Sequence, residues 1–187
     1  MFRLVANMLL SFVVMAGMSV GCFASEQIDN GVDSGERASS IIEAFDGLCV
    51  QCSEHYENID HFMDSFGGKE VPQNLTNWDP VMRENNGKAF HFKSDEVEYI
   101  VAYVKGGGCS VLVKDLPQKE VLEMIRQLYK AKQAGVLESG IQKQIAYNVG
   151  LKGYEGAVII VTVKKAGTGN EGGIGFVSSS AMAKIQQ

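Results

Sequence analysis

The sequence predicts an α+β domain in which an N-terminal helix and one later helix pack on an antiparallel sheet of about five to six strands. Two segments of the chain have the apolar spacing of amphipathic helices, and runs of alternating apolar residues follow each of them. The expected order is α-β-β-β-α-β-β-β. This order most simply gives one antiparallel sheet with the helices on one face.

The composition is that of a globular protein, since 45% of the 187 residues are apolar and 21% are charged. A net charge of -5 argues against a nucleic-acid partner, because nucleic-acid binders usually concentrate basic residues on one face. We expect no cofactor. The glycine pattern at 167–172 fits a dinucleotide motif in spacing, but a strand-like run follows it instead of the helix that would bind a pyrophosphate.

The first two dozen residues predict export. Arg3 precedes an almost wholly apolar run at 4–20, and small residues follow it, as in a signal peptide. Two processing routes compete. Removal of residues 1–24 would leave a flexible linker at 25–38 and a single domain at 39–187. A lipobox-like sequence ending at Cys22 would instead acylate that cysteine. We expect the protein in the periplasm or outside the cell, or held on a membrane as a lipoprotein.

The segment at 39–60 is predicted to form one amphipathic helix, because its apolar residues recur at steps of three and four. These residues are Ile41, Phe45, Leu48, Cys52 and Tyr56. The apolar spacing continues at 59, 62, 63 and 66 until two glycines break it, which indicates a kink or a second short helix from Asn58.

A change to alternating apolar residues predicts the strands. A meander of three strands is expected within 89–113, with a turn at the three glycines of 106–108. The second helix is predicted to begin at Asp115-Leu116-Pro117 and to stop before Gly135. Three more strands are expected at 141–148, 157–165 and 174–180, joined by glycine-rich loops.

Three cysteines remain in the domain, and an oxidising compartment should close one pair. A bridge from Cys49 or Cys52 to Cys109 would close a loop of about sixty residues and stabilise the fold by roughly 4 kcal/mol. A bridge between Cys49 and Cys52 would constrain almost nothing. The residues alone leave open which helical cysteine pairs with Cys109.

The segment Cys49-Val50-Gln51-Cys52 also has the spacing of redox and metal motifs. Thioredoxin-like cysteines lie at the start of a helix that follows a strand, whereas these lie inside a helix with no strand before it. Zinc could use Cys49, Cys52 and His55, which share neighbouring helix faces. A thiol or zinc-dependent enzyme is therefore the alternative to a structural disulfide.

The remaining residues form no intact catalytic constellation, so we expect a non-catalytic protein. The hypothesis is a protein-binding accessory or immunity-type factor whose partner is another protein of the cell envelope. Trp78 and Asp79 in a loop are the leading contact candidates, because loops often carry binding residues. His91, on the polar side of its strand, is a further candidate.

Phe45-x-x-x-Cys49 in the first helix, Trp78, and Gly108-Cys109 at the start of a strand resemble a group of small exported bacterial proteins of unknown function. Those proteins have a signal peptide, a Phe-x-x-x-Cys helix and a second cysteine in a strand. The resemblance covers roughly residues 41–128. It implies that Cys49 is the partner of Cys109, and it implies no activity.

Overall fold

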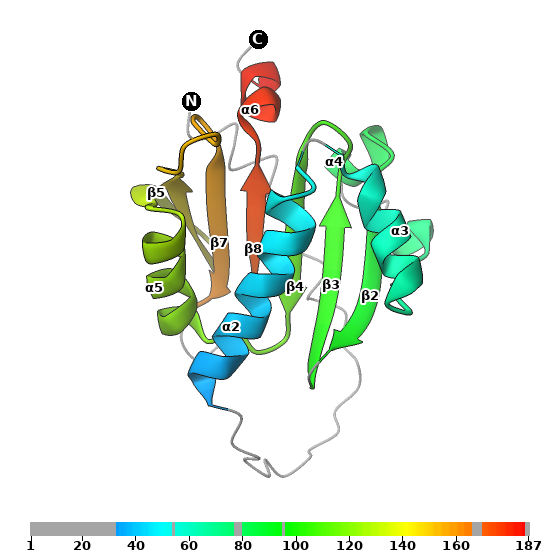
Figure 1. The fold of residues 1–187 in the computed structure, drawn as a ribbon, viewed down its shortest axis with the longest axis horizontal. Coiled ribbons are helices and arrows are strands. Elements are labelled where there is room, and N and C mark those ends of the chain that lie inside the picture. The colour runs from blue at the N-terminus through cyan, green and yellow to red at the C-terminus, as the bar shows by residue number, and fades with distance from the viewer. Residues whose placement is uncertain (1–32, 54, 77–79, 95, 166–169, 186–187) are drawn as a thin grey trace.

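The strands form one antiparallel sheet in the order β1-β2-β3-β4-β8-β7-β6-β5. The computed structural model describes residues 33–53, 55–76, 80–94, 96–165 and 170–185, and Figure 1 shows their arrangement. The eight strands are Lys69–Glu70 (β1), Lys88–Ser94 (β2), Val97–Tyr103 (β3), Gly108–Val113 (β4), Lys132–Ser139 (β5), Gln142–Asn148 (β6), Val158–Lys164 (β7) and Gly172–Val177 (β8). Each half of the sheet is a meander, and β8 joins the halves by pairing with β4.

Helices pack on both faces of the sheet. The α-helices of the described residues are Ser34–Phe45 (α2), Glu57–Ser65 (α3), Pro80–Glu84 (α4), Gln118–Leu128 (α5) and Ser179–Ile185 (α6). On one face, α2 crosses in front of β4 and β8, with α5 beside β5 and α3 near β2 and β3 (Figure 1). On the other face, Met82 of α4 and Ala181 of α6 join a smaller buried cluster that includes Ala102 and Ile160.

The architecture is α+β, but the predicted number and layout of elements are wrong. The described residues form eight strands instead of five to six, and five α-helices on two faces instead of two on one. Neither β1 nor β5 has a pattern that sequence could detect. β1 has two residues, and β5 is exposed along most of its length. The predicted second helix ends at Leu128, and a positive φ of 47° at Lys130 turns the chain into β5.

The predicted helix at 39–60 is interrupted. After α2, one wide π-helical turn spans Asp46–Val50, and α3 begins only at Glu57. The Asp46 carboxylate accepts hydrogen bonds from the Tyr129 hydroxyl at 2.7 Å and from the Gln51 amide at 2.6 Å. Burial, followed by the bond to Asp46, raises the pKa of Tyr129. These bonds tie the wide turn to the end of α5.

The main core lies between the sheet and the helices α2, α3 and α5. Ile41 and Phe45 of α2 are fully buried there, together with Tyr147 and Phe176 of the sheet. The Phe45 and Tyr129 rings meet edge to face, with their centroids 6.0 Å apart. Burying an aromatic or branched side chain of this size contributes about 1.5–3 kcal/mol, so this layer supplies most of the apolar stabilisation.

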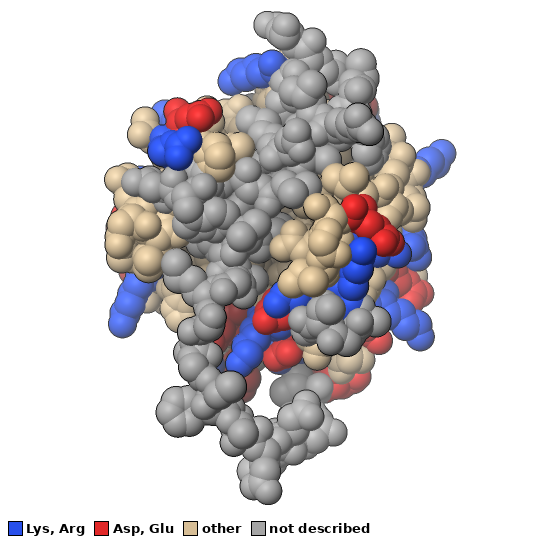
Figure 2. Space-filling model, turned by 180° about the vertical axis from the view of Figure 1, so that it is seen from behind, with Lys and Arg blue, Asp and Glu red and all other residues tan. Residues whose placement is uncertain are grey.

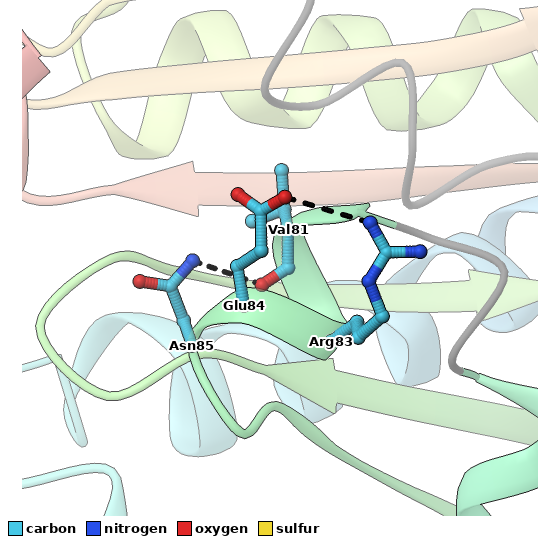
Figure 3. A network of polar contacts seen from close by, with 4 residues as sticks. All are labelled: Val81, Arg83, Glu84 and Asn85. Atoms are coloured by element: carbon cyan, nitrogen blue, oxygen red, sulfur yellow. Dashed lines mark hydrogen bonds and ion pairs between the residues drawn. The ribbon is translucent and has the colours of Figure 1, made fainter.

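The short helix α4 is held by its own polar groups. Figure 3 shows the Asn85 amide donating to the carbonyl oxygen of Val81 at 2.9 Å, with Arg83 3.5 Å from the Glu84 carboxylate. The Asn85 bond closes the end of α4, whereas the exposed pair of adjacent residues, Arg83 and Glu84, contributes little to stability. None of the helices among the described residues has both the length and the apolar character that crossing a membrane requires.

Candidate functional site

Helix α3 carries the most exposed aromatic side chains of the described residues. Ile59 and Met63 are buried against the sheet, with exposed fractions of 0% and 1%. Phe62 and Phe66 belong to the same apolar stripe, yet their exposed fractions are 41% and 70%. Residues four apart lie on one side of a helix, so the two phenylalanines form one apolar surface at the end of α3. We call Phe62 and Phe66 the α3 surface.

Polar bonds hold α3 rigidly on the sheet. The Tyr103 hydroxyl of β3 donates to one oxygen of the Asp60 carboxylate at 2.6 Å, and the Lys88 ammonium of β2 donates to the other. The Tyr56 ring, just before α3, packs on the Tyr103 ring at 5.8 Å between centroids. Because the helix is fixed from two strands, the α3 surface is presented without the ordering cost that a mobile segment would pay on binding.

Two glycines end α3 directly after Phe66. Gly67 has a φ of 70°, which side-chain-bearing residues rarely adopt. A Cβ on Gly68 would lie 3.0 Å from the Met63 sulfur and 3.2 Å from the Met63 carbonyl oxygen, so the chain passes close over the helix. It then enters β1, whose Lys69 pairs with His91 of β2. This sharp turn leaves Phe66 projecting from the helix end.

The surroundings of the α3 surface are acidic. The pKa of Lys88 is raised chiefly by its hydrogen bond to Asp60, and the charges of Asp60, Glu70 and Asp64 act in the same direction against partial burial. Asp60 pairs with Lys88, and the exposed Asp64 and Glu70 add negative charge that the exposed Lys69 offsets only in part. An apolar pair beside a net negative charge suits a protein surface that offers an apolar recess and basic side chains.

Cys49 lies in the π-helical turn after α2, Cys52 follows that turn, and Cys109 lies in β4. Cys49 and Cys109 form a disulfide with 5.2 Å between their Cα atoms, which is the pairing that the resemblance implies. Cys52 is a buried free thiol that donates to the Gly47 carbonyl oxygen at 3.3 Å. Burial raises the pKa of this thiol, and a raised pKa lowers the thiolate fraction that nucleophilic chemistry requires.

The three candidate zinc ligands lie in different surroundings. Cys49 is held in the disulfide, Cys52 is buried, and the His55 side chain is 71% exposed with its Nδ1 3.3 Å from the Glu57 carboxylate. Within the described residues, no three His, Cys, Asp or Glu side chains are grouped so that they could hold a metal ion. The structure therefore does not bring these candidate ligands together.

Of the four remaining residues that the sequence suggested as sites, the structure describes only His91. His91 is exposed on β2 and lies opposite Ile100 of β3. Trp78, Asp79 and Cys22 lie outside the described residues. Seen from the face opposite α2, some Lys and Arg side chains stand beside Asp and Glu side chains, and others stand apart from them (Figure 2).

The sequence alone did not reveal the α3 surface as a site. The signal was present, because the apolar spacing continued through Phe66 and stopped at two glycines. The same spacing also predicts a helix that simply continues, since apolar spacing by itself does not show where the sheet ends beneath a helix.

Comparison of this chain with protein-family models, with curated proteins and with solved structures finds no match.

Proposed function

We propose that this chain is an exported, non-catalytic protein of the bacterial cell envelope that binds another envelope protein through the α3 surface. One observation carries the proposal: Phe66 is 70% exposed on a helix that is otherwise locked to the sheet. Exposed apolar patches on rigid elements mark interaction sites more often than isolated exposed residues do. Aromatic side chains are also enriched among the residues that dominate binding energy.

Other features support the setting of this proposal. The apolar N-terminal run supports export, and the Cys49–Cys109 disulfide fits a compartment that allows such bonds. The acidic charge beside the α3 surface favours a partner with basic residues around an apolar recess, as an accessory or immunity-type factor would find on a basic target.

The proposal is tested by photo-crosslinking in cells that export the protein. A photoreactive residue is placed at position 62 or 66, and at position 61 in a matched control. His61 is exposed on the same helix, about half a turn away from the apolar stripe. We expect one discrete adduct of the same mass from positions 62 and 66, and none from position 61. With the photoreactive residue at position 62, the variant Phe66→Ser should give much less of the adduct, because it removes the neighbouring half of the α3 surface.

Two results would contradict the proposal. Adducts of equal yield from all three positions would show unspecific contact, and no adduct from positions 62 and 66 would remove the α3 surface as a docking site. Unfolding does not confuse the outcome, because exposed side chains away from core contacts usually change stability by less than about 0.5 kcal/mol when replaced. A thermal melt of each purified variant checks this.

A further inference from the structure

Strand β5 leaves the far edge of the sheet open. It has eight residues and lies at the end of the strand order, whereas the opposite edge strand, β1, has two. An edge strand presents unpaired N–H and C=O groups, and natural proteins usually keep such strands short or covered. In the described part of the chain, no strand pairs with the outer side of β5.

The backbone groups that point outward can be identified from the neighbouring strand. Residues of an antiparallel strand bond alternately to one neighbour and to the other. Ile141 and Val149 flank β6. The Ile141 carbonyl accepts from the Lys165 amide, and the Val149 amide donates to the Ala157 carbonyl, so the odd-numbered residues of β6 form their backbone hydrogen bonds with β7. The even-numbered residues of β6 therefore form theirs with β5.

This alternation gives the orientation of β5. Gln144 and Gln142 bond to Leu137 and Ser139, which lie opposite them in the register. The backbone N–H and C=O groups of Val136 therefore point out of the sheet. Those of Glu138 do the same, because Glu138 is opposite Lys143.

Apolar side chains accompany this open edge. Val136, in the middle of β5, is 44% exposed, and Leu128, at the end of α5, is 53% exposed. Figure 1 shows α5 standing beside β5 at the border of the sheet. The flank of the molecule therefore combines a hydrogen-bonding edge with a helix, and both contribute apolar side chains.

The charges of this flank complement a rotated copy of themselves. The first half of α5 carries Lys119 with the acidic residues Glu120 and Glu123, of which Glu120 bonds to Ser34 of α2, whereas its end carries Arg126, and Lys130 follows. A twofold axis just outside the outer edge of Val136, perpendicular to the sheet, would set α5 of one copy antiparallel to α5 of the other. The first half of each helix, which is net negative, would then lie beside the basic end of its copy.

We propose that a second copy of this chain binds along β5, so that two sheets join edge to edge with the α5 helices side by side. Near the twofold axis, the two Val136 residues exchange backbone hydrogen bonds, and their side chains meet. Twofold dimers are the commonest symmetric assemblies, and each uses one self-complementary surface. This proposal is independent of the α3 surface, which lies at the opposite end of the sheet.

The test measures the mass of the purified exported protein by light scattering over a series of concentrations. We expect a dimer whose dissociation constant rises by about tenfold or more in Val136→Lys, because an edge charge opposes strand pairing. Val136→Thr keeps the β-branched shape and should retain the dimer. Phe66→Lys introduces the same charge at the other end of the sheet and should also retain it.

Amide hydrogen exchange locates the contact. In the wild type, the outward amides of Val136 and Glu138 should exchange slowly at high protein concentration and quickly on dilution. The inward amide of Leu137 should be protected under both conditions. A wild type that stays monomeric with fast exchange at Val136 would overturn the proposal. A dimer that persists in Val136→Lys would also overturn it, whatever the crosslinking at α3 shows.

Discussion

Removing the disulfide between Cys49 and Cys109 should lower the free energy of unfolding by about 4 kcal/mol. The bond joins residues 60 positions apart in the sequence. On the chain-entropy estimate, closing a loop of that length removes about 14 cal/mol/K from the unfolded chain, or about 4 kcal/mol at 25 °C. Domains of this size are stable by only about 5–15 kcal/mol, so the loss would be a large fraction of the total.

Two forms of the protein separate the loop effect from packing. Both bridged cysteines are buried, with exposed fractions of 0% and 1%, so the double variant Cys49→Ala/Cys109→Ala also loses buried sulfur atoms. The reduced wild type keeps both sulfurs and loses only the bond. We expect the double variant to be at least as destabilised as the reduced wild type, because the cavity adds to its loss.

Urea unfolding at equilibrium measures both forms against the oxidised wild type. Cys52→Ala is the matched control, since it removes a buried cysteine that forms no disulfide, and it should cost only about 1 kcal/mol. A loss below about 1 kcal/mol on reduction, with an unchanged denaturant slope, would refute the loop argument. Alkylation of the native oxidised protein should modify no cysteine in the domain, because Cys52 is buried.

Two further predictions concern the anchor of α3 and the backbone. Tyr103 has a raised pKa, first from burial and then from its bond to Asp60. The folded state therefore keeps the neutral phenol while the unfolded state ionises, and stability should fall as pH rises above about 10. Tyr103→Phe should reduce this loss of stability, measured as the urea midpoint from neutral to alkaline pH. If the midpoint falls with pH as steeply as in the wild type, the prediction is contradicted. Gly150→Ala should lower the free energy of unfolding by about 1–3 kcal/mol, because its Cβ would lie 2.5 Å from the Lys130 carbonyl oxygen. Gly47→Ala is the control: its Cβ would meet no atom within 4 Å, so it should be neutral or stabilising in the same urea titrations.

The patterns that sequence revealed correctly are those with a strong local period. The strands at 97–103 and 158–164 are apolar or alternate along most of their length because they lie inside the sheet. The stripe of α2 is buried as its spacing predicts, with Ile41 and Phe45 inaccessible to solvent. Burial imposes the period on the residues themselves, so such elements can be recognised without the fold.

Edges and ends of the sheet could not be predicted in the same way. Strand β5 has one neighbour and exposed side chains, so its residues carry no alternation, and α6 begins where a strand was expected to continue. The interruption at Asp46 depends on Tyr129, which lies 83 positions later in the chain. Local spacing contains no information about such a contact.

The sequence by itself determined that the chain has an apolar run at 4–20, that it is α+β, and that Cys49 or Cys52 could meet Cys109. Only the tertiary structure decided that Cys49 lies next to Cys109, that Phe62 and Phe66 extend beyond the sheet, and that β5 is an open edge. The physical reason is the same in each case. An apolar residue is buried only if another element reaches it, and which elements reach it depends on contacts between residues far apart in the chain.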